Sequence, residues 1–139
     1  MKATVLLVED SKMQKIACER ILTHAGFTVL CAMDGEQGLA VAREKLPDVI
    51  LLDMLLPRIG GLQVLRLLRE QPQTARIPVI ILSTLPQLNE AKLRIEGAAG
   101  YYEKSRLLEE KKGEATFLEL LERTVQEARE RNSATANSA

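Results

Sequence analysis

Short apolar runs alternate along the chain with longer segments in which apolar residues recur every three or four positions. Short runs bounded by turn residues are typical of buried strands, and the longer spacing is typical of helices with one buried face. The expected strands cover residues 5–8, 28–32, 48–53, 78–83 and 98–103. The expected helices cover residues 11–25, 34–46, 62–68, 89–96 and 114–131.

This strict alternation predicts an α/β fold with a doubly wound, five-stranded parallel sheet. The run Asp48–Asp53 (DVILLD) is apolar on both faces, as in a central strand that helices cover on each side. In such sheets, ligands bind beyond the carboxyl ends of the strands. The polar residues expected at that edge are Glu9, Asp10, Asp53, Ser83 and Lys104.

Length and charge limit what the chain can be. The 139 residues suit one domain, expected over residues 1–131, followed by a small, polar, disordered tail over 132–139. Lys plus Arg equals Asp plus Glu at 19 each, so no net charge favours nucleic acid or a membrane surface. No signal peptide is evident, and no segment approaches the ~20 apolar residues of a membrane span. We expect a cytoplasmic protein whose two cysteines are reduced.

Three carboxylates end two strands that should be neighbours, namely Glu9 and Asp10 on one and Asp53 on the other. Packed together they would repel one another unless a cation lies among them, and Mg²⁺ binds such carboxylates while leaving room for phosphate oxygens. An aspartate beside this metal can act as a nucleophile toward phosphorus. The hydroxyl of Ser83 and the ammonium of Lys104 suit the phosphoryl oxygens. Taken singly, Asp10 could be a helix cap and Lys104 a surface lysine.

Four segments resemble, in order and spacing, the response-regulator receiver family. They are VLLVED (5–10), DVILLDMLLPRIGG (48–61), IPVIILST (77–84) and GAAGYYEKS (97–105). The resemblance covers nearly all of residues 3–131 and is most specific at Asp53, which Pro57 and Gly61 follow at four and eight residues. It implies a flavodoxin-like (βα)5 fold with strand order 2-1-3-4-5.

The resemblance also implies a Mg²⁺ site. Asp10 would hold the metal directly and Glu9 through water. Asp53 and the backbone carbonyl of Leu55 would complete the protein ligands. Asp53 matches the aspartate that accepts the phosphoryl group.

Three further residues match functional positions of the family. Ser83 corresponds to the switch hydroxyl, and Lys104 to the lysine that pairs with the phosphate. Tyr101 corresponds to the aromatic residue that changes its exposure on activation, although it could also be an ordinary half-buried strand residue.

Two departures from the family pattern stand out. Ser105 follows the lysine where the family usually has proline, so the geometry of that loop is left open. Leu55 and Leu85 lie two residues beyond Asp53 and Ser83, where polar side chains can help to place an attacking water. We expect these leucines to slow hydrolysis of the acyl phosphate, which the loss of label from purified phosphoprotein would measure.

The function implied is a stand-alone response regulator of a two-component phosphorelay. A sensor histidine kinase or phosphotransfer protein would donate the phosphoryl group. A downstream protein would bind the face formed by the fourth helix, fifth strand and fifth helix, with no nucleic-acid or membrane partner. The protein would be a monomer or weak dimer, and an enzyme only in its own phosphorylation and dephosphorylation.

The sequence also bears on three alternative functions. A binding or scaffold module that works without phosphate stays open, although the acids and the lysine are all retained. A haloacid-dehalogenase-type phosphatase is disfavoured because its second aspartate would stand at Leu55. A nucleotide-binding role of the common kinds is disfavoured because no G-x-G-x-x-G or P-loop pattern occurs.

Overall fold

Five parallel strands form one sheet at the centre of the chain, in the order β2-β1-β3-β4-β5. The structure is a computed structural model that describes residues 3–84, 90–108 and 110–137. The strands are β1 Thr4–Val8, β2 Thr28–Ala32, β3 Val49–Asp53, β4 Val79–Ser83 and β5 Gly100–Glu103. The expected fold class and strand order are therefore confirmed.

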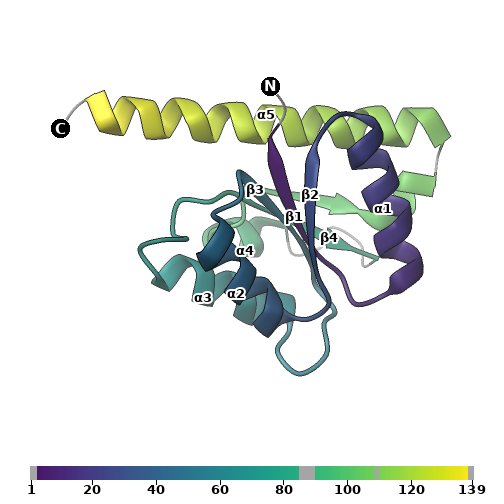
Figure 1. The fold of residues 1–139 in the computed structure, drawn as a ribbon, viewed down its shortest axis with the longest axis horizontal. Helices are drawn as coiled ribbons and strands as arrows, with labels where there is room; N and C mark the ends of the chain where they lie inside the picture. Colours follow the sequence, from purple (N-terminus) through teal and green to yellow (C-terminus); the bar gives the residue numbers. More distant parts are fainter. Residues whose placement is uncertain (1–2, 85–89, 109, 138–139) are drawn as a thin grey trace.

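Helices cover both faces of this sheet (Figure 1). They are α1 Lys12–His24, α2 Gly35–Lys45, α3 Gly61–Glu70, α4 Glu90–Ile95 and α5 Glu110–Asn137. A short 3-10 helix, η2 Lys104–Leu108, connects β5 to α5. Of the fourth helix expected over 89–96, Asn89 lies outside the described residues.

Two hydrophobic layers sandwich the sheet, and alternate strand residues enter each layer. In β3, Ile50 and Leu52 pack into the layer that α2, α3 and α4 cover. Val49 and Leu51 pack into the layer that α1 and α5 cover. Because successive strand side chains point to opposite faces, a fully apolar strand serves both layers. This explains why every residue of β3 is buried.

Side-chain caps begin two of the helices. The side chain of Ser11 accepts a hydrogen bond from the backbone N–H of Gln14 at the start of α1. Asp34 accepts one from the backbone N–H of Gln37 at the start of α2. Each cap satisfies an N–H group that the first helical turn leaves without a partner.

The carboxyl-terminal third differs from expectation. Residues 104–108 form a 3-10 turn, and α5 begins at Glu110, four residues before the start expected at residue 114. The helix then continues to Asn137, so residues 132–137 are helical and not a disordered tail. Residues 131–137 contain no glycine or proline, and two alanines favour helix there, so nothing local ends it at Arg131. Residues 138–139 lie outside the described residues.

Two smaller expectations concern cysteines and membranes. Cys18 is buried and Cys31 partly buried, and both are free thiols, as expected. In the described parts of the chain, none of the helices has the length and apolar character to cross a membrane.

Candidate functional site: an acidic pocket at the carboxyl edge of the sheet

The pocket forms where β1 and β3 end side by side. Val8 pairs with Leu52 in the parallel register, so Glu9 and Asp53, the next residues, emerge together. The backbone N–H of Glu9 also bonds to the carbonyl of Ala32, at 3.0 Å, which fixes the exit of β1 from the sheet. The expected meeting of these acids at one sheet edge is what the structure shows.

Glu9, Asp10 and Asp53 form one carboxylate cluster. Each offers an oxygen within 4.8 Å of the others. Glu9 and Asp53 are only 2% and 5% exposed, whereas Asp10 is exposed to solvent. Three oxygen donors, one of them open to water, match the preference of Mg²⁺ for a few carboxylates plus water. The donor set therefore fits a Mg²⁺ ion.

Lys104 supplies the positive charge that this structure places in the pocket. It lies where β5 passes into η2, and its side chain is 11% exposed. Its Nζ forms an ion pair with Glu9 and lies 3.1 Å from Oδ2 of Asp53. The same ammonium donates to Oε1 of Gln14, at 2.6 Å. One cation thus contacts the ends of both strands and the first turn of α1.

Burial dominates the protonation of Glu9. The pKa of this carboxyl is raised from an ordinary 4.5 to about 7, mainly by burial, with Lys104 acting to lower it and the neighbouring Asp53 acting to raise it. A carboxylate shielded from water prefers its neutral form unless a cation compensates. The pocket is therefore poised to gain from an additional positive charge.

Backbone contacts fix the carboxylate of Asp53. Its Oδ1 accepts a hydrogen bond from the backbone N–H of Leu55, at 3.2 Å, while Oδ2 faces Lys104. The N–H of Met54 donates to the carbonyl of Leu82, at 3.1 Å, so the chain leaves the sheet in a defined direction. The N–H of Gly61 closes the loop by donating to the carbonyl of Met54, at 3.0 Å.

Ser83 and Tyr101 occupy different surroundings. Ser83 ends β4 one residue beyond Leu82, the register partner of Asp53, and is buried. It therefore lies at the same sheet edge as the acids. Tyr101 is 8% exposed and packs within the hydrophobic layer beneath α3 and α4, as a buried strand residue.

Gln14 is a pocket residue that the sequence did not predict. It stands three residues after the Ser11 cap, in the first turn of a helix that starts directly beyond Asp10. That position alone placed it at the carboxyl edge of the sheet, but a glutamine carries no specific chemical signal.

The two departures from the family pattern have different outcomes. Among the described residues every peptide bond is trans, including the bond between Lys104 and Ser105, and Lys104 still reaches Asp53. Leu55, whose backbone N–H contacts Asp53, is 59% exposed. Leu85, its expected counterpart, lies outside the described residues.

Comparison with known proteins gives a consistent result. A family profile described as the response regulator receiver domain matches residues 5–111. Protein PilH of Pseudomonas aeruginosa is 39% identical over 85 residues, which are 61% of this chain and 70% of that protein. The polar-differentiation response regulator DivK of Brucella anthropi is 30% identical over 105 residues, 75% of this chain and 85% of that protein.

Longer proteins match as well. Response regulator PleD of Caulobacter vibrioides is 40% identical over 85 residues, but this chain spans only 19% of its length.

Among solved structures, the chemotaxis protein CheY4 of Vibrio cholerae superposes with a TM-score of 0.77 at 28% identity, over 89% of this chain and 99% of that one. A CheY-like receiver domain protein of Methanospirillum hungatei, at 19% identity and a TM-score of 0.79, shares the fold over 94% of this chain and 99% of that one.

Proposed function

The chain belongs to the response regulator receiver domain family, and from this membership we propose that it is a phosphorylation switch whose acceptor is Asp53. One observation carries the proposal. The buried Asp53 carboxylate is fixed by a backbone N–H on one oxygen and faces Lys104 with the other, beside Glu9 and Asp10. This is the arrangement that acyl-phosphate formation requires.

The reaction is a transfer of a phosphoryl group between two side chains. An oxygen of Asp53 attacks the phosphorus of a partner's phosphohistidine. The new O–P bond forms as the P–N bond breaks, and the electron pair of that bond returns to the imidazole. The protein's task is alignment and neutralisation of charge on the phosphoryl oxygens. Lys104 already lies 3.1 Å from Asp53 and supplies one such charge.

Glu9, Asp10 and Asp53, with the backbone carbonyl of Leu55, would hold Mg²⁺. When bound, the ion supplies a second positive charge to the phosphoryl oxygens. Asp10 is the exposed member of the set and keeps one side of the site open to water and to the donor. The raised pKa of Glu9 is consistent with a site that is completed by a cation.

Ser83 and Tyr101 would carry the signal away from Asp53. The hydroxyl of Ser83 stands at the same sheet edge and would bind a phosphoryl oxygen. Tyr101 begins in a buried position, so a change in its exposure would alter the face formed by α4, β5 and α5. α4 also ends in Ile95, which is 86% exposed and so offers an apolar contact to a downstream protein.

The partners follow from this role. A cytoplasmic sensor histidine kinase or phosphotransfer protein would be the donor, and the output would be contact with another protein. PilH and DivK, which this chain covers over most of their lengths, support a stand-alone type.

Labelling with acetyl phosphate and Mg²⁺, followed by intact-mass spectrometry, tests the acceptor. Wild type should gain one phosphoryl group, and Asp53→Asn should gain none. The matched control is Asp48→Asn, just before the opposite end of the same strand, which should label like wild type. Labelling of Asp53→Asn, or of wild type in EDTA at the same rate, would contradict the proposal.

Measurements of partner binding distinguish the proposed switch from a scaffold module that works without phosphate. A switch should bind its output partner more tightly when phosphorylated, and Asp53→Asn should lose that gain. Equal binding by wild type and Asp53→Asn, with and without acetyl phosphate, would favour a module that works without phosphate.

A further inference from the structure

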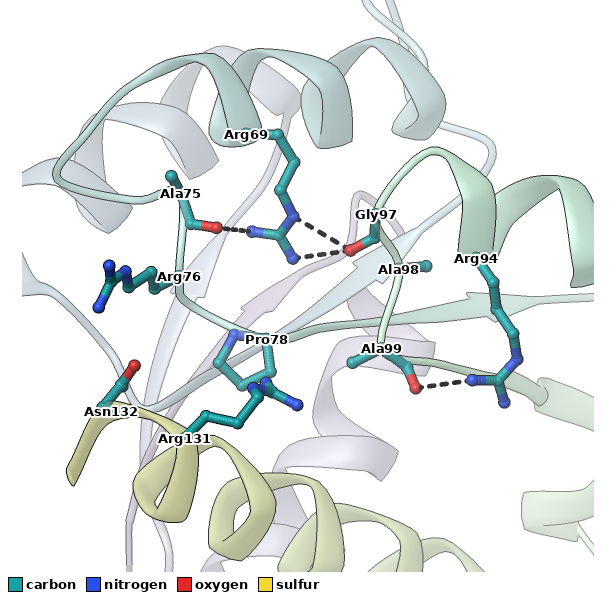
Figure 2. Close-up of a pocket in the computed structure, with 10 residues that line it drawn as sticks. All are labelled: Arg69, Ala75, Arg76, Pro78, Arg94, Gly97, Ala98, Ala99, Arg131 and Asn132. Carbon is teal, nitrogen blue, oxygen red and sulfur yellow. Dashed lines mark hydrogen bonds between the residues drawn. The ribbon is translucent and has the colours of Figure 1, made fainter. Parts of the chain in front are cut away.

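A second polar hollow lies at the opposite, amino-terminal edge of the sheet. Its volume is about 430 Å³, and it opens beside the residues that lead into β4 and β5. Four of the ten residues that line it are arginines, and none of these described lining residues is acidic (Figure 2). The arginines are Arg69 of α3, Arg76 of the following loop, Arg94 of α4 and Arg131 of α5.

Arg69 builds the frame of the hollow. Its Nε and one terminal nitrogen both donate to the carbonyl of Gly97, at 3.0 and 2.9 Å. Its other terminal nitrogen donates to the carbonyls of Ala75 and Ile77, at 3.1 and 2.8 Å. The side chain thus ties the loop after α3 to the loop after α4, as Figure 2 shows for Ala75 and Gly97. Its charge is retained, but its donors are used within the protein.

The remaining arginines lie at the surface of the hollow. Arg76, Arg94 and Arg131 are all exposed. Arg94 donates to the carbonyl of Ala99 at 3.3 Å, which holds it over the entrance to β5. Arg131 extends from α5 past Pro78 in Figure 2. Burial, and then the positive charge of Arg131, lowers the pKa of Arg69, so the charges at this edge repel one another.

Two carboxylates that adjoin the hollow, Asp48 and Glu96, are paired with other groups. Asp48 lines the adjoining hollow, where it accepts a hydrogen bond from the backbone N–H of Thr4 and pairs with Arg129 at 3.7 Å. Glu96 forms a two-pronged ion pair with Arg66. Neither carboxylate lines the arginine hollow itself.

We propose that this hollow binds a phosphate-bearing small molecule of about nucleotide size. Guanidinium groups match phosphate oxygens in charge and in planar geometry, which makes arginine the usual residue for recognising phosphate. Arg94 and Arg131 are the principal phosphate contacts, with Arg76 at the rim. The amide of Asn132 adds a neutral donor beside them.

The size and the floor of the hollow select the ligand class. A volume of about 430 Å³ is within the range of small-molecule sites and exceeds what a single phosphate ion fills. Pro78, Ala98 and Ala99 give the floor apolar surface on which a planar ring can lie. α3, α4 and α5 each contribute a wall, so the hollow suits a compact ligand better than an extended acidic peptide.

The hollow is separate from the acidic pocket. Pro78 directly precedes β4 and Ser83 is its last residue, so the two lie about 16 Å apart at the usual rise of a strand. Arg131 and Asn132 also lie beyond residues 5–111 that the family profile matches. Both residues are in place because α5 continues past Arg131.

Calorimetric titration of the full chain with ADP in EDTA tests the proposal, with ¹⁵N NMR to locate the site. ADP should bind, with shifts at the amides of Gly97, Ala98 and Ala99. Arg131→Gln should weaken binding severalfold, and Arg94→Gln/Arg131→Gln at least tenfold. The matched control is Arg123→Gln, two turns earlier in α5 and outside the hollow, which should bind ADP like wild type.

Ligand and salt comparisons complete the experiment. Adenosine should bind far more weakly than ADP, inorganic phosphate should also bind more weakly, and added salt should weaken ADP binding in wild type. The salt series needs no variant and stays informative if a substitution unfolds the protein. No ADP binding at millimolar concentration, shifts confined to Glu9 and Asp53, or equal binding by the double variant would overturn the proposal. Tighter binding of a polyglutamate peptide or of inorganic phosphate would overturn the ligand class.

Discussion

At the scale of single residues, Lys104 is the group on which the acidic pocket depends. Its ammonium contacts Glu9 and Asp53, which are almost wholly buried. Two buried carboxylates without a compensating charge are costly, so the cation stabilises the pocket.

Replacing Lys104 by methionine should therefore slow phosphorylation. We expect Lys104→Met to take up label from acetyl phosphate and Mg²⁺ at least tenfold more slowly than wild type, because a charge on the phosphoryl oxygens is lost. Lys45→Met, at the exposed end of α2, is the control and should label normally. Equal rates for both variants would show that the ammonium has no part in the transfer.

The raised pKa of Glu9 predicts that the stability of the metal-free protein depends on pH. Its pKa is about 7 in the folded protein against an ordinary 4.5, so the folded state binds the extra proton between these values. The stabilisation is complete below pH 4.5 and is lost as the pH rises through 7, with a size on the order of 3 kcal/mol. Urea denaturation in EDTA at pH 5 and 7.5 should show this loss in wild type but not in Glu9→Gln.

The affinity for Mg²⁺ should rise with pH, whereas the stability of the metal-free protein falls. The proton on Glu9 competes with the cation, so Mg²⁺ should bind more tightly as the pH rises from 5 to 7. Titration of wild type at several pH values measures this effect. A pH-independent affinity would show that Glu9 takes no part in holding the ion.

At the scale of elements, the start of α3 holds the end of β3 in place. A Cβ on Gly61 would lie 2.5 Å from the backbone oxygen of Asp53 and 2.8 Å from Cα of Met54. Both are backbone atoms, so the loop that follows Asp53 must shift. Gly60 differs, since a Cβ there has only the backbone oxygen of Met54 nearby, at 3.9 Å.

The two neighbouring glycines therefore form a matched pair. Gly61→Ala should lower the free energy of unfolding by about 2 kcal/mol and slow labelling of Asp53, because overpacking against backbone displaces it. Gly60→Ala should stay close to wild type in both. Urea midpoints and acetyl-phosphate labelling check the pair, and equal effects would contradict the close approach of Gly61 to β3.

The elements were predictable where one local signal decided them. The strand at residues 28–32 and the helices that begin after Ser11 and Asp34 formed as expected, because burial and the capping of N–H groups act within a few residues. The acids and Lys104 were placed correctly because parallel strands end at one edge. The role of Arg69 was not predictable, since its carbonyl partners are up to 28 residues away and any arginine could supply the donors.

The carboxyl-terminal third shows a second limit. The last helix was expected from residue 114, but it begins at Glu110, because η2 and the start of α5 pack against each other. Tyr102 fixes this region, because its hydroxyl donates to the carbonyl of Gly113 at 2.7 Å and its ring lies 5.2 Å from that of Phe117. Tertiary contacts of this kind override local composition.

At the scale of the whole molecule, α5 is anchored by its first two thirds. Phe117, Leu121, Val125 and Ala128 are buried, whereas residues 129–133 are exposed. Most of the packing energy of the helix therefore comes from residues before Arg129.

Ending the chain at Arg131 should accordingly leave the fold intact. We expect the free energy of unfolding to fall by less than about 1 kcal/mol, since exposed residues contribute little. Phe117→Ala should by contrast cost about 3–5 kcal/mol, because it empties a buried position. A collapse of the shortened protein in urea denaturation would show that the last turns support the core.

The length of α5 also gives the molecule a rigid arm. At 1.5 Å per residue, its 28 residues measure about 42 Å, against about 17 Å for a five-residue strand. The arm extends past the sheet towards the C-terminus in Figure 1. A fluorophore or reporter joined directly to Asn137 in continuous helix would keep a fixed direction relative to Asp53. Each inserted residue would turn it by about 100° around the helix axis, so the phase of the junction would govern what such a probe reports.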